Sequence, residues 1–385
     1  MPVLPFRFLW ALLLAMLLAG PVTAQDGYEI FRGSDENSEI RIDYTPWNLV
    51  LQPMVMAVGP SNRYKGRQER GRGASRISIS NTNPSWLEGS RVHFNQLTPE
   101  MLAAISEYRS ELQALPARLG GMDKLSRREQ LAYWLNLYNL VVFDEVAQRY
   151  PIIKLRLLRS GGASGIGLWD QKLIRVEGVD LSLNDIQNNI LIPIFDDPLV
   201  LYGLYQGSVG GPNIRSVAYT GRNVIEKLEL NALDFINSIR GIHLKGRTAR
   251  ISMIYEWGKA AFPGGEEDIR AHMMSFADAQ TREILDYARN LRADYFDWYV
   301  TDLFAGRPMW GSMYSTMITT MDGFTRPENV RMPRHAQNFL RELATKFIIY
   351  GFPTGIVTID EIESDTVDVP SEDTDEENER NQPLT

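Results

Sequence analysis

The sequence contains no cysteine among its 385 residues. This absence excludes disulfides, zinc–thiolate sites, a cysteine nucleophile and a lipidated N-terminal cysteine. A chain without disulfides must obtain its stability from a hydrophobic core, and 44% of these residues are apolar. A core of substantial size is therefore expected.

Histidine is scarce, with four copies at His93, His243, His272 and His335. No two of them lie within one helical turn, so the sequence offers no local metal-binding pair, and we predict no metal site. The glycine-rich stretch 161–167 matches neither a dinucleotide-binding nor a P-loop fingerprint. We therefore predict no cofactor.

Long apolar runs are also rare. One run, Phe8 to Leu18, follows Arg7 and precedes the small-residue site 22–24, a pattern typical of a signal peptide over residues 1–24. No later stretch approaches the ~20 apolar residues that a membrane-spanning helix needs. We expect a periplasmic or secreted protein with no transmembrane anchor after signal cleavage.

Charge is unevenly distributed along the chain. From Asp360 onward there are 11 acidic residues and one basic residue, whereas the rest carries 39 basic and 37 acidic residues. The near-neutral remainder argues against nucleic acid as a partner. Few apolar residues accompany the acids, so residues 364–385 are predicted to be disordered. The arginine-rich stretch 62–76 is either a solvated loop or a contact for an anionic lipid, a cell-wall polymer or the acidic tail.

One helix, over residues 126–150, organises the sequence. Ser126 and Glu129 form a Ser-x-x-Glu capping box at its start, and its apolar residues surround most of its girth, which indicates deep burial. Asn136 and Asn139 lie three residues apart on one face and must be hydrogen-bonded if buried. They either clamp nearby loop backbone or line a polar cleft.

Short strands and more abundant helices alternate along the chain, which predicts an α+β fold. We expect a helix-rich single domain around a small sheet over residues 43–303, after an irregular lead-in at 25–42. A C-terminal helical extension at 304–363 and the acidic tail follow. Strands are expected at 91–94, 173–176 and 199–205. Helices are expected from 45, 98 and 182, and at 220–239, 251–261, 266–276, 280–292 and 333–350.

Ser208 is the best-placed hydroxyl, because it sits in the glycine-rich turn 206–214 after a buried apolar run. The turn lacks the first glycine of a nucleophile elbow, and no helix follows immediately. The adjacent acids at 144–145 and 196–197 diverge in direction and are expected at solvated edges or turns. Trp169-Asp170 and Asp297-Trp298 suit either sugar contact or core packing.

Several stretches together resemble the domain-of-unknown-function 547 family, across about residues 43–303. The most specific is a Trp-x-Asn-x-Tyr-Asn signature within Ala132–Asn139. The supporting stretches are Asp43–Trp47, Arg91–Phe94, Leu181–Ile186 with Ile190-Leu191, Gly207–Tyr219, Ile251–Trp257 and Tyr295–Trp298. The family has no settled activity that the resemblance could supply.

The chain departs from the family pattern where chemistry would be expected. Family members usually carry Cys-x-Ser-x-x-Cys-Pro, and here Gln206 and Gly211 replace both cysteines. A histidine frequent in the family aligns with Asn188. Because an activated thiolate needs a base, any thiol chemistry of the family is unexpected here.

Loss of these positions favours a non-catalytic, exported binding or scaffold protein of the cell envelope, whose partner is an unknown envelope protein or polymer. No catalytic residue is assigned. The alternative is an envelope hydrolase or transferase with a non-cysteine nucleophile such as Ser208. The predicted binding residues are Trp134, Asn136, Tyr138, Asn139, Gln206, Ser208 and Asn213.

Overall fold

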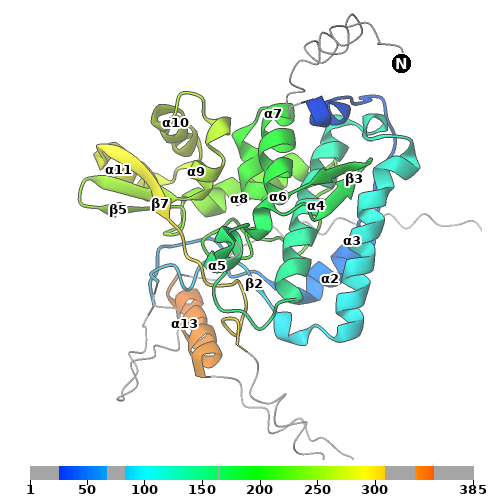
Figure 1. Cartoon of the computed structure of the whole chain (residues 1–385). Helices are drawn as coiled ribbons and strands as arrows, with labels where there is room; N and C mark the ends of the chain where they lie inside the picture. Colours follow the sequence, from blue (N-terminus) through cyan, green and yellow to red (C-terminus); the bar gives the residue numbers. More distant parts are fainter. Residues whose placement is uncertain (1–25, 67–82, 163–164, 308–333, 351–385) are drawn as a thin grey trace, which may run out of the picture. The chain divides into compact units, whose positions relative to one another are not determined.

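The computed structural model describes residues 26–66, 83–162, 165–307 and 334–350. This part of the chain is helix-rich with small antiparallel and mixed sheets, which confirms the α+β prediction (Figure 1). The predicted signal peptide, the acidic tail and most of the arginine-rich stretch lie outside the described residues.

Helix α4 (Arg127–Ala147) is the centre of the core, as predicted, and from Glu129 to Ala147 all of its residues are buried. The Ser126 Oγ accepts from the Glu129 amide and caps the helix. The Glu129 carboxylate does not complete the capping box. It accepts instead from the amides of Ile42 and Gly221 at 3.0 and 3.1 Å. Glu129 thereby ties the start of α4 to two segments far away in sequence.

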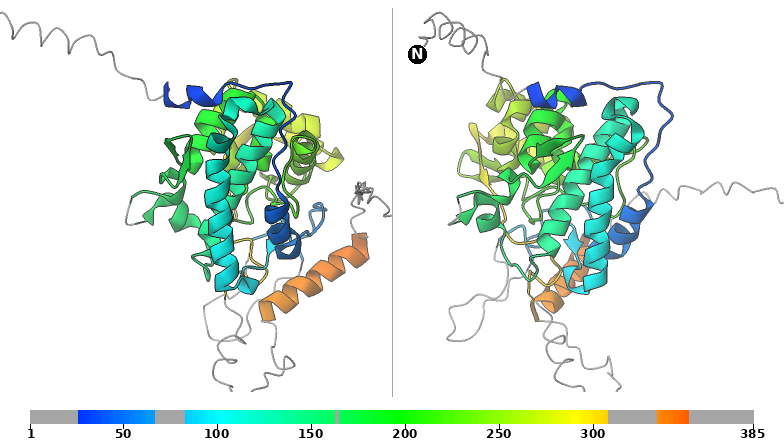
Figure 2. Two further views of the ribbon diagram at one scale, coloured as in Figure 1. Left: turned by 90° about the vertical axis from the view of Figure 1, so that its right-hand side faces the viewer. Right: turned by 45° about the vertical axis from the view of Figure 1, so that its right-hand side comes forward.

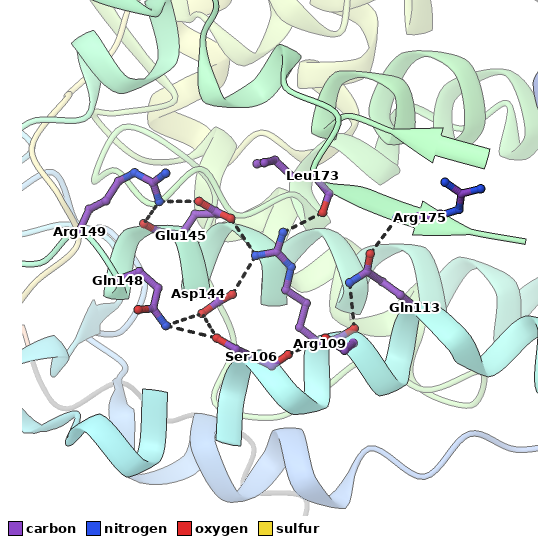
Figure 3. Close-up of polar contacts among 10 residues, drawn as sticks. Ser106, Arg109, Gln113, Asp144, Glu145, Gln148, Arg149, Leu173 and Arg175 are labelled. Carbon is purple, nitrogen blue, oxygen red and sulfur yellow. Dashed lines mark hydrogen bonds and ion pairs between the residues drawn. The ribbon is translucent and has the colours of Figure 1, made fainter. Parts of the chain in front are cut away.

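Helix α3 (Pro99–Leu119) runs alongside α4, and both views in Figure 2 show the two helices side by side. A charged cluster joins them (Figure 3). Arg109 Nη1 donates to Asp144 Oδ2 and Glu145 Oε1, each at 2.8 Å, and Nη2 donates to the Leu173 carbonyl oxygen. The predicted solvation of this acidic pair is wrong, because both carboxylates are buried. Arg109 pairs with both acids and Arg149 pairs with Glu145 as well, so two arginines balance the two carboxylates, which makes their burial tolerable.

The run 199–205 is buried as predicted, but it does not form a strand. It lies mostly in a 3₁₀ helix, η7 (Pro198–Gly203). The Asp197 side chain accepts from the Leu199 amide and caps it, and Pro198 occupies its first turn. A continuous apolar run indicates burial but does not distinguish strand from helix. Of the acidic pair at 196–197, Asp196 is exposed and Asp197 is half-buried, which agrees with the expected solvated position.

Other predicted helices are present with adjusted ends. Ser182 and Asp185 form a complete capping box at α6 (Leu183–Asp185), which continues into a π-helix, η6 (Ile186–Leu191), and α7 (Ile192–Phe195). Helix α8 begins later than predicted, because Thr220 accepts from the Asn223 amide in a turn that precedes it. The remaining α-helices are α2 (Thr45–Met54), α5 (Arg156–Ser160), α8 (Val224–Ile236), α9 (Ile254–Trp257), α10 (Glu266–Phe276), α11 (Ala279–Tyr287) and α13 (Arg334–Tyr350). The short 3₁₀ helices are η1 (Asp26–Phe31), η2 (Phe94–Gln96), η3 (Met122–Lys124), η5 (Leu168–Asp170) and η8 (Lys259–Ala261).

The largest of the small sheets was missed by the sequence analysis. Antiparallel β5 (Ile242–Lys245) and β6 (Thr248–Ser252) are joined by β7 (Asn290–Tyr295), which runs parallel to β6. The predicted helix at 251–261 therefore starts only after β6, and the one at 280–292 ends before β7. The other sheets pair β1 (Val55–Met56) with β2 (Arg91–Val92), and β3 (Ile174–Val176) with β4 (Val179–Leu181).

Helix α13, in the predicted C-terminal extension, packs on a second and smaller apolar cluster. Phe339 meets Trp86 with ring centroids 6.1 Å apart, and the Lys346 ammonium donates to the Pro60 carbonyl oxygen at 3.1 Å. Among the helices that the structure describes, none combines the length and the apolar character needed to cross a membrane.

Candidate functional site

Asn136 and Asn139 each bind loop backbone through both ends of the amide. Asn136 donates to the Tyr219 carbonyl oxygen at 2.7 Å and accepts from the Tyr219 amide at 3.0 Å. Asn139 donates to the Gly203 carbonyl oxygen at 2.9 Å and accepts from the Tyr205 amide at 2.8 Å. Of the two interpretations of these asparagines, the structure shows the backbone clamp. A role in ligand binding stays a prediction.

Of three more predicted binding residues, Trp134 and Ser208 are buried and Asn213 is half-buried. Trp134 is fully buried and meets Phe31 edge-on, with ring centroids 5.0 Å apart. Asn213 accepts from the Ser90 amide and from Arg240. The Ser208 side chain is 1% exposed, and its Oγ makes no hydrogen bond within the described part of the chain. A serine nucleophile needs a base at hydrogen-bond distance, and Ser208 therefore has no such base among the described side chains, which do not include His335.

The other two predicted residues, Tyr138 and Gln206, belong to one hydrogen-bonded chain. Trp169 Nε1 and Gln206 Nε2 both donate to the Tyr138 hydroxyl, at 2.8 and 3.1 Å. Gln206 Oε1 accepts from Arg159 Nη1 at 2.7 Å. The chain leads from the buried face of α4 outward to Arg159, which the sequence analysis did not single out.

Arg159 lies between two tryptophans. Its Cζ is 3.5 Å from the ring centroid of Trp257 and 4.6 Å from that of Trp169. Stacking of a guanidinium on aromatic faces is favourable because the ring faces carry negative charge. Burial lowers the pKa of Arg159 to about 10, which leaves the side chain charged at neutral pH.

A pocket of about 460 Å³ opens beside Arg159. One wall is aromatic: the ring centroids of Phe296 lie 4.9 Å from Trp257 and 4.7 Å from Trp298, and those two tryptophans are 5.9 Å apart. The lining comprises Arg156, Arg159, Ser160, Met253, Trp257, Asp294, Phe296 and Trp298. Such an aromatic wall with a few polar groups is typical of a small-molecule site.

The pocket draws its residues from three separate parts of the chain. Arg156, Arg159 and Ser160 form α5, Met253 and Trp257 lie at α9, and Asp294 to Trp298 lie at and after the end of β7. Of the two pairs flagged for sugar contact, Trp298 lines this pocket. Trp169 is 1% exposed and packs in the core behind Arg159.

Of the three positions at which the family resemblance expects cysteine or histidine, Gln206 contacts a pocket residue directly, and Asn188 is linked to one through Gln187. Gln206 binds Arg159. Gln187 Nε2 donates to Asn188 Oδ1 at 3.3 Å and to the Trp257 carbonyl oxygen at 3.0 Å. Gln187 and Asn188 sit in the π-helix η6, and π-helical turns occur frequently at functional sites.

The lining shows no group ready for proton transfer. The Asp294 carboxylate pairs with Arg250 through Oδ1 and with Arg292 through Oδ2. Among the lining residues that the structure describes, Ser160 is the one hydroxyl, and no histidine accompanies it there. Within the described ranges, no cluster of three or more carboxylate or imidazole side chains could hold a metal ion.

A comparison with protein families gives a match over part of the chain. Residues 122–236 match the model described as "Protein of unknown function, DUF547", which confirms the suspected resemblance over this range. No curated protein and no solved structure matches the chain. The matched range includes α4, α5 and the turn that carries Gln206, whereas the aromatic wall of the pocket lies C-terminal to it.

Proposed function

We propose that this chain is an exported, non-catalytic binding protein of the cell envelope, and that the pocket beside Arg159 is its ligand site. The observation that carries the proposal is the wall of Trp257, Phe296 and Trp298 on a pocket without a free base. Partly exposed aromatic rings supply large apolar contact area and suit the flat faces of sugar rings. An envelope polymer built of sugars is therefore the proposed ligand.

The surroundings of two serine hydroxyls, those of Ser208 and Ser160, support the absence of catalysis. Ser208 is buried and its Oγ has no partner among the described residues, while Ser160 lines the pocket without an adjacent histidine. General acid–base catalysis requires a titratable group within about 2.6–3.2 Å of the proton it moves. The Asp294 carboxylate is held by two arginines and is not free for that role.

Export is proposed from the sequence of residues 1–24 alone. A C-terminally tagged chain should fractionate with the envelope or the medium, and a variant without residues 2–24 should stay in the cytoplasm. Retention of the full-length chain in the cytoplasm would contradict export without affecting the pocket.

Binding is tested with the mature chain and soluble envelope oligosaccharides, followed by tryptophan fluorescence. We expect saturable quenching that Trp298→Ala abolishes. Tyr287→Ala is the matched control, because Tyr287 is 51% exposed and outside the pocket lining. Equal binding by the Trp298→Ala variant would exclude the pocket as the site.

The same mixtures, analysed by mass spectrometry after long incubation, test catalysis. We expect each oligosaccharide to be recovered unchanged. Cleaved or transferred product that disappears in Ser208→Ala or Ser160→Ala would overturn the non-catalytic proposal and support the hydrolase or transferase alternative.

A further inference from the structure

The pocket carries an excess of positive charge. Among the described lining residues Asp294 is the one acid, and Arg250 and Arg292, which do not appear in that lining, already neutralise it. Arg156 and Arg159 each carry a positive charge, and neither forms an ion pair within the part of the chain that the structure describes. The pocket therefore has positive charge that an anionic ligand could pair with.

Arg159 also has hydrogen-bonding capacity left. A guanidinium carries five N–H donors, and the side-chain acceptors near Arg159 are Gln206 Oε1 and the Tyr138 hydroxyl, which leaves donors for a ligand. Arg91 is a useful contrast, because it too has no ion pair with a described acid. Arg91 donates to four backbone carbonyl oxygens, those of Trp86, Glu88, Gly89 and Ser90, and lies in the fold interior. Arg91 is satisfied by its own chain, whereas Arg159 is not.

The position of Arg159 suits recognition of a planar oxyanion. One side of its guanidinium stacks on Trp257, which fixes the plane of the group, and Gln206 fixes its rotation from behind. A guanidinium held in this way presents paired N–H groups that match a carboxylate or a phosphate. Loss of conformational freedom on binding is then small.

We infer that the pocket takes a sugar ring bearing a carboxylate or a phosphate, with Arg159 and Arg156 on the oxyanion and Trp257 and Trp298 against the ring. This inference rests on the proposed function and specifies its ligand class. A neutral sugar would leave the excess positive charge unpaired, so the acidic form is favoured over the neutral one.

The test compares two pairs of probes on the mature chain by calorimetry: trigalacturonate with its methyl ester, and glucose 6-phosphate with glucose. We expect at least one acidic probe to bind about 10- to 100-fold more tightly than its neutral match, as hydrogen bonds to charged groups imply. Binding should weaken with added salt. Tight binding of the uronate or of the sugar phosphate identifies which oxyanion the pocket takes.

Variants of the two arginines then test which side chain binds the oxyanion of the probe. Arg159→Gln should remove most of the preference for the acidic probe. Arg156 is exposed and its replacement is expected to leave the fold intact, so Arg156→Gln provides a second reading, with about 2- to 5-fold weaker binding of the acid and unchanged binding of the ester. Arg222→Gln is the matched control, because Arg222 is exposed and outside the pocket lining.

The outcomes separate the two proposals. Equal binding of acid and ester, both lost in Trp298→Ala, would keep the binding site and overturn the anionic ligand. Acid preference that survives both Arg156→Gln and Arg159→Gln would also overturn it. Failure of all the probes and of the envelope oligosaccharides to bind would overturn the proposed function itself, and the inference with it.

Discussion

The guanidinium groups of Arg109 and Arg159 are both packed within the fold, but they have different kinds of partner. Arg109 lies between α3 and α4, where it pairs with two buried carboxylates, one of which also binds Arg149, and donates to a backbone oxygen (Figure 3). Arg159 has an amide oxygen and two aromatic faces, and it forms no ion pair with an acid among the described residues. The charge of Arg109 is paired within the protein, whereas the charge of Arg159 lies beside a pocket and is not paired with a described acid. The comparison therefore distinguishes an arginine that stabilises the fold from one that is available to a ligand.

The strongest test of this comparison is Arg109→Met. The substitution would leave Asp144 without its cation and Glu145 with Arg149 alone, in a buried setting. We expect the free energy of unfolding to fall by about 3–5 kcal/mol, as for other broken buried pairs. Urea titration followed by circular dichroism measures it. Replacing all three residues with apolar ones should restore most of the loss, and a loss below about 1 kcal/mol in Arg109→Met would show that the cluster contributes little.

Asp302 provides the opposite case, a buried carboxylate with no described ion pair. Burial raises the pKa of Asp302 to about 7, although the amides of Gly306 and Phe304 donate to its Oδ2. Because the folded pKa exceeds the unfolded value near 4, stability is highest at low pH and declines as the pH rises toward 7. From pH 5 to pH 8 this group alone should lower the free energy of unfolding by about 2–3 kcal/mol.

The measurement is urea unfolding of wild type and Asp302→Asn at both pH values. All other titratable groups are common to the two proteins, so the difference between the two pH dependences isolates Asp302. Parallel pH dependences would mean that Asp302 is ionised in the folded state throughout this range.

Arg159→Met should have a much smaller effect on folding than Arg109→Met. Methionine keeps a flexible apolar chain between Trp257 and Trp169, and no buried carboxylate loses a cation. We expect a loss of about 1 kcal/mol or less, mainly from the unpaired Gln206 oxygen. Both variants should be unfolded in the same urea series. Equal losses would identify Arg159 as a structural residue and remove the contrast.

The smallest effect is expected for Arg149→Ala. Arg149 is 40% exposed and shares Glu145 with Arg109, so Glu145 keeps a partner after the substitution. Exposed ion pairs contribute little, and we expect a change of about 0.5 kcal/mol or less. A loss comparable to that of Arg109→Met would show that the cluster depends on its outer member.

Local signals predicted the helices well. Ser126 and Ser182 each start a helix at the expected residue, because a cap is a contact between residues three apart. The strand predicted at 199–205 was wrong, and the sheet of β5, β6 and β7 was missed. In the first case burial was apparent but the Asp197 cap was overlooked. In the second, β6 pairs with a strand that begins about 40 residues later, which no local pattern reveals.

From the sequence, single residues in or near the pocket could be singled out, but the pocket itself could not be predicted. Gln206, Tyr138 and Trp298 were each noted for separate reasons, yet nothing in their spacing connects them. Arg159 connects the first two to the aromatic wall, and it carries no motif of its own. A site built from α5, α9 and the end of β7 is a property of tertiary packing.

The clamps of Asn136 and Asn139 have a consequence for hydrogen exchange. The amides of Tyr205 and Tyr219 lie in irregular backbone, where fast exchange with solvent is usual, yet they donate to side chains anchored one helical turn apart on α4. Their exchange must therefore wait until α4 itself opens or separates from the loop. The segment from Gly203 to Tyr219 is therefore expected to unfold together with α4. The backbone amides near Gln206 and Arg159 should exchange as slowly as those at the centre of the core.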